Sequence, residues 1–350
     1  MINAPSGRTR PSELDAPVKL RIATFNLENL GEKPHHPGEV PPLAERIAVL
    51  RPQLLRLDAD VLCLQEINGQ KTERGYTLAA LDTLLEGTKY ASCERIITER
   101  KSGKGALDVH NLAILSAFPI ASHRQLRHEI VAPPDYRLVT AAPASEAPSA
   151  ISWERPLLQA ALSLPGGRTL HVLNLHLRAP LAAYVPGQKA GAFAWKSVAG
   201  WAEGFFLAAV KRAGQALEAR LAVDEILDGD AQAMIAVCGD CNAEARETAM
   251  RLLAGAEEDT GSGDLAGRVL IAAENSLPED RRFTVIHNGR RVMLDHLLMS
   301  RALMALYRGT EIHNEALGDE LVGYANAASD GGLSPESCHA PVVASFELPD

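Results

Sequence analysis

Residues 60–66 read Asp60-Val61-Leu62-Cys63-Leu64-Gln65-Glu66, a short and mostly apolar run that ends in a carboxylate. A run of this kind is typical of a strand that is buried on both faces of a sheet. A carboxylate at the end of a buried strand costs free energy unless it is paired or binds a metal ion. The run therefore predicts a sheet with a polar site at one edge.

The same arrangement recurs elsewhere in the chain. Residues 18–22, 170–175, 234–237 and 292–299 are strand-like, and polar side chains interrupt these runs or lie near their ends. The last predicted strand, at 341–348, is preceded by His339. The polar residues at the other strands are Asn26, Glu28, Asn174, His176, Asp240, Asn242 and Asp295. If they converge on one edge of a sheet, they form a polar site on a rigid scaffold.

Helical patterns are fewer than strand-like ones. Apolar residues recur with helical spacing over residues 43–57, where Pro52 predicts a kink or two short helices. A helix is expected near residues 78–85, and one or two long helices over about 190–227. Because strands outnumber helices without alternating with them, the sequence favours a layered α/β sandwich over a doubly wound parallel sheet.

The chain is expected to form one domain, although its 350 residues suggest one large domain or two ordinary ones. It has no repeat of fixed period and no clear linker. We expect a loose N-terminal arm at 1–17, a single domain over 18–350, and a helical insertion near 184–228.

The composition, with 46% hydrophobic and 23% charged residues, is that of a soluble globular protein. The net charge of −9 disfavours binding of polyanions through bulk charge, so a phosphate-bearing substrate would need a local basic patch or a bound cation. No apolar run approaches the about 20 residues of a membrane span, and no secretory signal is evident. With five scattered cysteines, these features predict a cytoplasmic protein with free thiols, and none indicates an obligate protein partner.

The polar residues at the strand ends indicate a chemistry. Carboxylate and amide oxygens without cysteine ligands suit a hard cation such as Mg²⁺ or Mn²⁺. Histidines beside them suit phosphate contacts or acid–base work. This combination is expected of metal-assisted hydrolysis of a phosphoester.

Six segments resemble the endonuclease/exonuclease/phosphatase superfamily, whose members include enzymes like deoxyribonuclease I and exonuclease III. In the family's order they are Thr24-Phe25-Asn26-Leu27-Glu28-Asn29, Asp60-Val61-Leu62-Cys63-Leu64-Gln65-Glu66, Asn174-Leu175-His176-Leu177, Gly239-Asp240-Cys241-Asn242, Leu294-Asp295-His296 and His339-Ala340-Pro341-Val342. Each is weak alone, and six in order are a strong signal. The resemblance implies a four-layer α/β sandwich, with two mixed β-sheets packed face to face and helices outside, and a divalent-metal phosphoesterase.

The resemblance also implies roles for single residues. Glu66 would be the principal metal ligand, with Asn26 and Glu28 beside it, although Glu28 has the alternative of an exposed loop acid. Asp240 would orient or deprotonate the attacking water, and Asn242 would contact the scissile phosphate.

The histidines complete the implied machinery. His176 would face the phosphate, and His339 would stabilise developing charge or assist proton transfer while Asp295 holds its ring. Arg155 and Asn174 are candidate substrate-binding residues, with a surface ion pair and a structural hydrogen bond as their respective alternatives.

The sequence departs from the family at the residue before the last histidine. The family usually has an aspartate there as a further metal ligand, and this chain has Cys338. We hypothesise that the loop Ser329-Asp330-Gly331-Gly332 folds back so that Asp330 supplies the missing carboxylate. The alternative is a weakened metal site with a solvated loop.

The helical insertion has two interpretations. Its lysines and arginine are interleaved with Trp195, Trp201, Phe205 and Phe206, a combination that can grip single-stranded nucleic acid by stacking. Aromatic residues at helical spacing more often pack inward, and we favour that interpretation.

The leading function is therefore a phosphodiesterase that hydrolyses DNA or RNA. The alternative is a phosphatase or phospholipase-type enzyme acting on small phosphoesters or lipids, because the superfamily includes such members. A third interpretation is a non-catalytic protein that binds a phosphorylated ligand, which Cys338 motivates and the full set of site residues disfavours.

Overall fold

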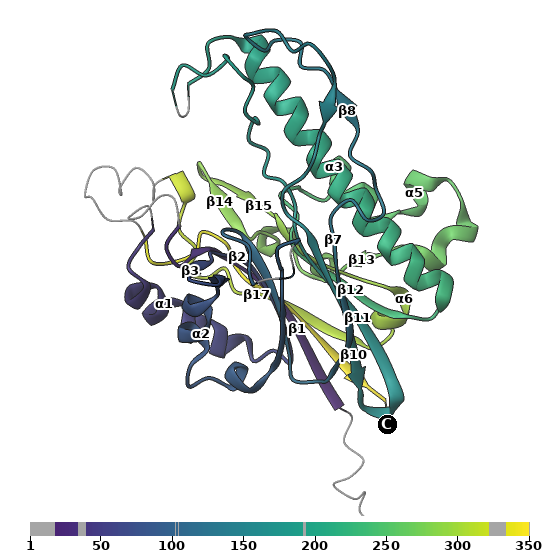
Figure 1. Ribbon diagram of the computed structural model, residues 1–350. Helices are drawn as coiled ribbons and strands as arrows, with labels where there is room; N and C mark the ends of the chain where they lie inside the picture. The colour runs from purple at the N-terminus through teal and green to yellow at the C-terminus, as the bar shows by residue number, and fades with distance from the viewer. Residues whose placement is uncertain are drawn as a thin grey trace, which may run out of the picture.

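Two six-stranded sheets pack face to face, and helices cover their outer surfaces (Figure 1). The computed structural model describes residues 18–33, 40–101, 103, 105–191, 194–321 and 334–349. The expected four-layer α/β sandwich with two mixed sheets is confirmed. The expected arm at 1–17 lies outside the described residues.

The first sheet has the strand order β17-β18-β1-β2-β6-β5. Its strands are β1 (Val18–Leu30), β2 (Val61–Ile67), β5 (Glu94–Ile97), β6 (Asn111–Ser116), β17 (Tyr307–Ile312) and β18 (Val342–Leu348). Only the central pair of β1 and β2 is parallel among its pairings.

The second sheet has the order β13-β16-β12-β11-β10-β7. Its strands are β7 (Ile120–Leu126), β10 (Leu157–Leu164), β11 (Arg168–His176), β12 (Met234–Asp240), β13 (Ile271–Ala272) and β16 (Asp295–Met299). Here the parallel pair is β11 with β12. Three two-stranded hairpins complete the strands: β3 (Gln70–Thr72) with β4 (Gly75–Thr77), β8 (Asp135–Tyr136) with β9 (Ser149–Ala150), and β14 (Val285–His287) with β15 (Arg290–Val292).

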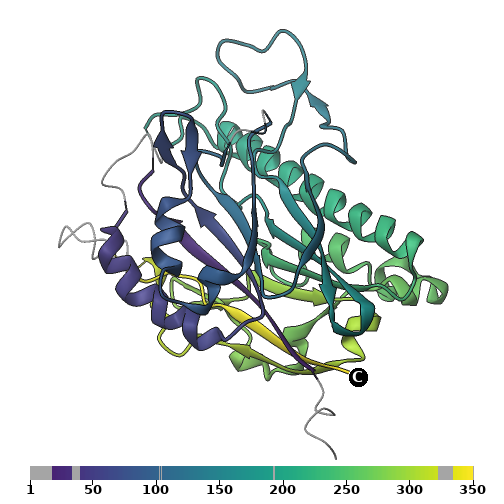
Figure 2. The same cartoon turned by 60° about the horizontal axis from the view of Figure 1, so that its bottom comes forward.

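Helices form the two outer layers, as Figures 1 and 2 show from two directions. The α-helices are α1 (Leu43–Leu57), α2 (Ala79–Leu85), α3 (Val198–Gly229), α4 (Thr248–Ala254), α5 (Glu257–Thr260) and α6 (Arg301–Met304). Apolar residues of α1 and α2 pack on the first sheet, and those of α3 and α4 pack on the second. A third core fills the space between the sheets.

The period-two alternation of β1 explains how one strand serves two cores. Leu20 and Ile22 point into the core between the sheets, whereas Phe25 and Leu27 point toward the helices. Asn26 lies two positions beyond Thr24 on the inter-sheet face, so its amide reaches the space between the sheets where β1 ends.

The two parallel pairs determine where polar side chains collect. Asn26 pairs in register with Gln65 at the end of β2, and His176 pairs with Asp240 at the end of β12. Since parallel strands end at the same edge, both pairs deliver polar residues to one side of the sandwich.

The helical insertion differs from our expectation for its aromatic residues. Its helix, α3, extends beyond the sheets toward β8 (Figure 1). Trp201, Phe205 and Phe206 are 45%, 39% and 47% exposed, so the inward-packing interpretation is wrong for these three. Trp195 is half-buried against a small separate cluster around Leu207.

Three local expectations also need correction. α1 runs from Leu43 to Leu57 through Pro52, so the alternative of two short helices is wrong. The sequence also predicts a strand near residues 90–97, but β5 begins only at Glu94, because a 3₁₀ turn occupies Lys89–Ser92. The strand expected over 292–299 is divided between β15 and β16, and the second part begins at Asp295.

Gly239 is required by the close approach of β12 to β11. Its φ is +140°, and a Cβ there would lie 1.9 Å from the carbonyl oxygen of Leu175. We expect Gly239→Ala to lower the free energy of unfolding by about 3 kcal/mol or more, since backbone strain and overpacking each cost about 1–3 kcal/mol. Urea denaturation measures this change. Gly229→Ala is the control, because a Cβ at Gly229 meets no atom within 4 Å, and an equal loss in both variants would contradict the explanation.

Candidate active site

Four side chains from the two parallel pairs meet at the edge of the sandwich. Nε2 of His176 lies 3.4 Å from Oε1 of Glu66 and 3.3 Å from Oδ2 of Asp240. The amide nitrogen of Asn26 donates to the same Asp240 oxygen at 3.0 Å and lies 3.4 Å from Oε1 of Glu66. The two sheets therefore join here through a polar cluster.

Backbone turns in the left-handed region orient several of these side chains. Eight non-glycine residues in the described chain have φ between +40° and +75°, and five of them flank this edge: Glu28, Asn29, Glu66, His110 and Asn242. The register of β2 shifts around Glu66, which turns its carboxylate toward the inter-sheet side. Left-handed residues other than glycine cost about 1–3 kcal/mol each and concentrate at functional sites.

Glu66 and Asp240 are held as carboxylates despite their burial. Burial alone would raise the pKa of Glu66, but His176 and then His110 hold it at about 2. Burial likewise opposes ionisation of Asp240, while hydrogen bonding and the charges of His176 and His339 keep its pKa well below the ordinary value. Both groups are therefore anions at neutral pH and can bind a cation.

Asp295 and His339 form a second pair beside this cluster. Nδ1 of His339 lies 2.7 Å from Oδ2 of Asp295, which is fully buried at the start of β16. Burial alone would lower the pKa of His339, but the carboxylate of Asp295 raises it well above the ordinary value. His339 is therefore a cation at neutral pH.

Asn242 and Arg155 frame the cluster. The backbone and side-chain amides of Asn242 donate to Asp240 at 2.8 and 2.9 Å, which fixes that carboxylate. Nη1 of Arg155 contacts Nε2 of His176 and donates to the carbonyl of Leu177 at 3.1 Å. The side-chain amide nitrogen of Gln215 on α3 donates to the backbone carbonyl of Arg155 at 2.9 Å, which holds Arg155 in place.

The donor chemistry of the cluster fits a divalent cation. Glu66, His110 and His176 each offer a ligand atom, and all three atoms lie within 4.8 Å of one another. Asp240, Asp295 and His339 form a second such group, in which Oδ1 of Asp295 is buried without a hydrogen-bond partner in the described chain. Carboxylate oxygens and imidazole nitrogens are common ligands of divalent metals in proteins.

Glu28 lies against the position of the missing family acid. One oxygen of its carboxylate accepts the backbone N–H of Cys338 at 2.6 Å. Burial raises the pKa of the Cys338 thiol to about 12, so this side chain is not a thiolate at neutral pH. Asp330, which we expected to supply the carboxylate, lies outside the described residues.

Asn174 is not brought to the cluster. Its side chain is fully buried, accepts from Gln65 at 2.7 Å, and donates to the carbonyls of Leu64 and Ala113 at 3.0 and 2.9 Å. These bonds join the two sheets. The position of Asn174 therefore fits the structural hydrogen bond that we gave as its alternative role, rather than contact with substrate. His296 is likewise buried and bonded to Glu274, away from the cluster.

His110 is the site residue that the sequence analysis missed. It precedes β6, which is antiparallel to β2, and Asn111 pairs with Ile67 just after Glu66. Its ring contacts that of His176 edge-on, with 5.9 Å between the centroids. The sequence shows only a histidine just before a predicted strand. The antiparallel pairing of β6 with β2 is needed to place this histidine beside Glu66.

Arg46 connects two loops of the site from behind. This α1 residue is buried, and its guanidinium donates to the carbonyls of Leu27 and Glu28 on one side. On the other side it donates to the carbonyls of Pro335 and Glu336, at 3.0 and 2.8 Å, just before His339. No sequence pattern indicated this contact, because Pro335 and Glu336 lie 289 and 290 residues from Arg46 along the chain.

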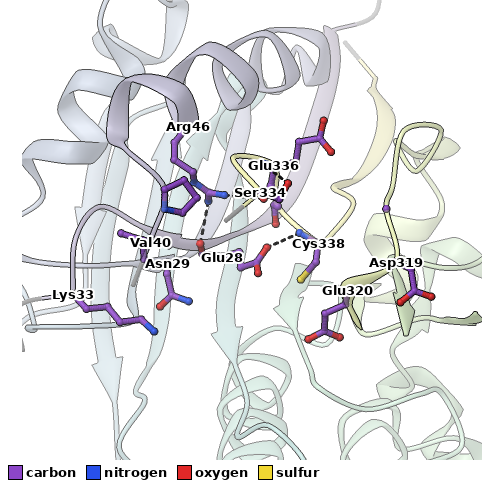
Figure 3. Close-up of a pocket in the computed structure, with 13 residues that line it drawn as sticks. Glu28, Asn29, Lys33, Val40, Arg46, Asp319, Glu320, Ser334, Glu336 and Cys338 are labelled. Atoms are coloured by element: carbon purple, nitrogen blue, oxygen red, sulfur yellow. Dashed lines mark hydrogen bonds between the residues drawn. The ribbon is translucent and has the colours of Figure 1, made fainter. Parts of the chain in front are cut away.

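A cavity of about 170 Å³ opens beside this clamp (Figure 3). It is lined by Glu28 and Cys338, which it shares with the site, and by further acidic residues. The acids other than Glu28 are Asp319, Glu320 and Glu336, and the basic lining residues are Lys33 and Arg46. The immediate surroundings of Glu28 are thus richer in carboxylates than in cations.

Comparison with protein families decides the relationship. The family model described as "Endonuclease/Exonuclease/phosphatase family" matches residues 23–330. The chain belongs to this family. It is therefore a phosphoesterase, a hydrolase of phosphoester bonds, in a family that depends on divalent metals, and the expected resemblance is confirmed.

Solved structures show the same fold at low sequence identity. An endonuclease/exonuclease/phosphatase family protein from Bacteroides thetaiotaomicron is 14% identical with a TM-score of 0.57, covering 95% of this chain and 96% of that one. A truncated TDP2 from Caenorhabditis elegans is 15% identical with a TM-score of 0.54, covering 94% and 98%. A mannosyl-6-phosphatase from Bacteroides thetaiotaomicron is 15% identical with a TM-score of 0.55, covering 93% and 98%. A search of curated protein sequences gave no match.

The described helices include none that is both long enough and apolar enough to cross a membrane.

Removal of the Arg46 clamp is expected to disturb both stability and catalysis. Arg46→Ala leaves four carbonyls without their donor, so we expect a loss of about 3 kcal/mol in the free energy of unfolding and lower turnover by the folded protein. Urea denaturation and phosphodiesterase assays measure the two effects. Arg51→Ala is the control, because Arg51 lies on the same helix and bonds the carbonyls of Thr83 and Leu84 away from the site. Wild-type turnover in Arg46→Ala would show that the clamp does not position the site.

Proposed function

We propose that the chain is a divalent-metal-dependent phosphodiesterase whose substrate is DNA or RNA. The observation that carries the catalytic part is the convergence of Glu66, Asp240 and the Asp295–His339 pair on one cluster. Carboxylates for a cation, a carboxylate for water and a cationic histidine are the groups that phosphoester hydrolysis requires.

We assign the metal to Glu66 with Asn26 and Glu28, and Mg²⁺ or Mn²⁺ as the ion. A divalent ion bound there would neutralise the phosphate and the negative charge that develops in the transition state. Asp330 stays a candidate for a further carboxylate. The carboxylate of Glu28, which bonds the backbone of Cys338, supports Glu28 as an alternative source of that charge.

We assign the water to Asp240. Its depressed pKa makes it a weak base, so it serves better to orient the water through a hydrogen bond than to take its proton completely. Asn242 fixes the Asp240 carboxylate and leaves it correctly directed. Arg155 and His176 would meet the phosphate oxygens, because Arg155 contacts His176, and Nε2 of His176 lies 3.4 Å from the Glu66 carboxylate.

We assign the leaving group to His339. Its raised pKa keeps a proton on the ring, and Asp295 holds Nδ1, so Nε2 is the nitrogen that can donate to the leaving oxygen. Asp295 is then a positioning residue that also stabilises the imidazolium.

Exposed aromatic residues of the helical insertion support nucleic acid as the substrate. Trp201 and Phe205 stack with 5.6 Å between their ring centroids, and Phe206 lies 5.3 Å from the ring of Tyr136. Bases of a single strand stack on such surfaces at about 1–3 kcal/mol each. The same helix contacts the site at Gln215, whose side-chain amide donates to the backbone carbonyl of Arg155 at 2.9 Å.

A phosphatase acting on small phosphoesters is the second candidate. The net charge of −9 and the acidic residues around Glu28 repel a long polyanion more than a compact substrate. Hydrolysis of single-stranded oligonucleotide, plasmid, bis(p-nitrophenyl) phosphate and p-nitrophenyl phosphate distinguishes the candidates. Turnover of the monoester alone would overturn the nuclease proposal, and no turnover of any of them would overturn the enzymatic one.

Loss of either proposed catalytic group is expected to abolish most of the activity. We expect Asp240→Ala and His339→Ala to lower kcat on oligonucleotide about a thousandfold, within the range of general acid–base contributions. Steady-state rates in Mg²⁺ and Mn²⁺, with EDTA as a blank, measure this. His123→Ala, an exposed histidine on β7, is the control. Near-normal rates in His339→Ala would remove His339 from the mechanism.

The charge of Asp295 is expected to set the alkaline limit of activity. Because the raised pKa keeps His339 protonated, kcat/KM should fall as pH rises through that pKa. The protonated His339–Asp295 pair also stabilises the folded protein, fully below about pH 6.5, and this contribution is lost as pH rises through the raised pKa. Asp295→Asn removes the carboxylate charge, so burial dominates and the alkaline limb moves to lower pH. The pH–rate profile measures the shift, with the exposed Asp264→Asn as control. An unmoved limb would assign it to another group.

A further inference from the structure

Two histidines stand beside Glu66 where oxygen ligands alone were expected. The ligand atoms of Glu66, His110 and His176 all lie within 4.8 Å of one another. Ligands of one ion are separated by about 3–4 Å at the metal–ligand distances of about 2.0–2.2 Å that Zn²⁺ adopts, so modest side-chain movement brings the three onto one ion.

Both imidazoles are prepared to act as ligands. His176 is 1% exposed and presents Nε2 at 3.4 Å from Glu66, and Nδ1 of His110 is buried without a hydrogen-bond partner in the described chain. His110 is held at φ +55°, a conformation that costs free energy in a non-glycine residue.

One positive group competes with a cation for this position. Nη1 of Arg155 contacts Nε2 of His176, the nitrogen that lies 3.4 Å from Glu66. The same Arg155 nitrogen also donates to the carbonyl of Leu177, so the guanidinium keeps a partner when Nε2 is taken.

The donor set of this chain is therefore richer in nitrogen than a Mg²⁺ site. Cys338 stands where an acid would add an oxygen ligand, and His110 places a nitrogen donor beside Glu66. Mg²⁺ prefers oxygen ligands and water, whereas imidazole suits first-row transition ions.

We propose that His110 and His176 join Glu66 as ligands of one divalent ion, so that the site binds Mn²⁺, Co²⁺ and Zn²⁺ through nitrogen and more tightly than Mg²⁺. The proposal deepens the proposed function, because it concerns the metal of the same site. It adds His110 as a ligand, and it gives His176 a metal-binding role in place of a phosphate contact alone.

The test is direct observation of nitrogen ligation in the full chain. The protein is first freed of metal and then loaded with Mn²⁺ or Co²⁺. Pulsed electron paramagnetic resonance of the Mn²⁺-loaded protein should show ¹⁴N coupling from imidazole, and Co²⁺ titration should give the visible absorption of a nitrogen-ligated ion. The variant is His110→Asn, because asparagine tolerates the left-handed conformation. The control is His171→Asn, a half-buried histidine on the strand that carries His176.

We expect His110→Asn to weaken Co²⁺ and Zn²⁺ binding about tenfold or more, since loss of a group that only orients a ligand already costs 10–100-fold. Mg²⁺ affinity in calorimetry should stay within about twofold, and His171→Asn should bind all ions as the wild type does. Urea denaturation of the metal-free proteins verifies that His110→Asn folds.

The outcomes separate this proposal from the proposed function. Absence of ¹⁴N coupling, or equal Co²⁺ affinity in His110→Asn and wild type, overturns the ligand assignment even if the protein hydrolyses nucleic acid. Nitrogen coupling that His110→Asn reduces supports the assignment even if no phosphoester is hydrolysed, and the catalytic proposal would then fail alone.

Discussion

The structure depends on the cost of holding two buried carboxylates as anions at the seam between the sheets. Glu66 and Asp240 lie within 3.4 Å of a single histidine nitrogen, and an uncompensated charge in such a place would cost several kcal/mol. The fold compensates them with the charges of neighbouring histidines, chiefly His176, and with amide donors from Asn26, Asn29 and Asn242. Such donors stabilise the anions while leaving oxygen lone pairs for a cation. If lysine or arginine side chains paired with these carboxylates, the oxygen atoms would not be available to bind a cation.

The same requirement explains where backbone strain is placed. Side chains on a regular strand alternate between its faces, so Glu66, two residues after the outward Leu64, would also point outward, and a bulge is needed to turn it inward. Five left-handed non-glycine residues surround this edge, and their combined cost is of the order of the whole stability of a domain. The three apolar cores, which run along both faces of both sheets, supply the stabilisation that offsets it. Rigidity around the site is thus a consequence of the four layers.

The sequence predicted the layers, the polar residues at the strand ends and most of the clustered residues, because these follow from local patterns. Glu66 and Asp240 each end a buried apolar run, and that pattern needs no knowledge of pairing. His110 depends on an antiparallel partner, so its position beside Glu66 was invisible until β6 was placed against β2. Arg46 was equally invisible, since a lone arginine on a helix predicts solvent contact rather than four carbonyls from two remote loops. Sequence periodicity likewise predicted burial for Trp201, which lies on a helix that extends past the sheet it would pack on.

The absence of an acid at residue 338 has a physical consequence for the last strand. An aspartate there would add a negative charge next to Glu28, whereas the side chain of Cys338 is neutral and its backbone N–H donates to the Glu28 carboxylate at 2.6 Å. Arg46 then closes the arrangement, because it bonds the carbonyl of Glu28 and those of the residues that lead to Cys338. One carboxylate and one guanidinium thus hold together two loops that a shared metal ion could otherwise join. The segment that carries His339 is therefore held by hydrogen bonds of the protein itself, from Ser337 to the carbonyl of Asn26 and between His339 and Asp295, so His339 keeps its place without an acid at residue 338.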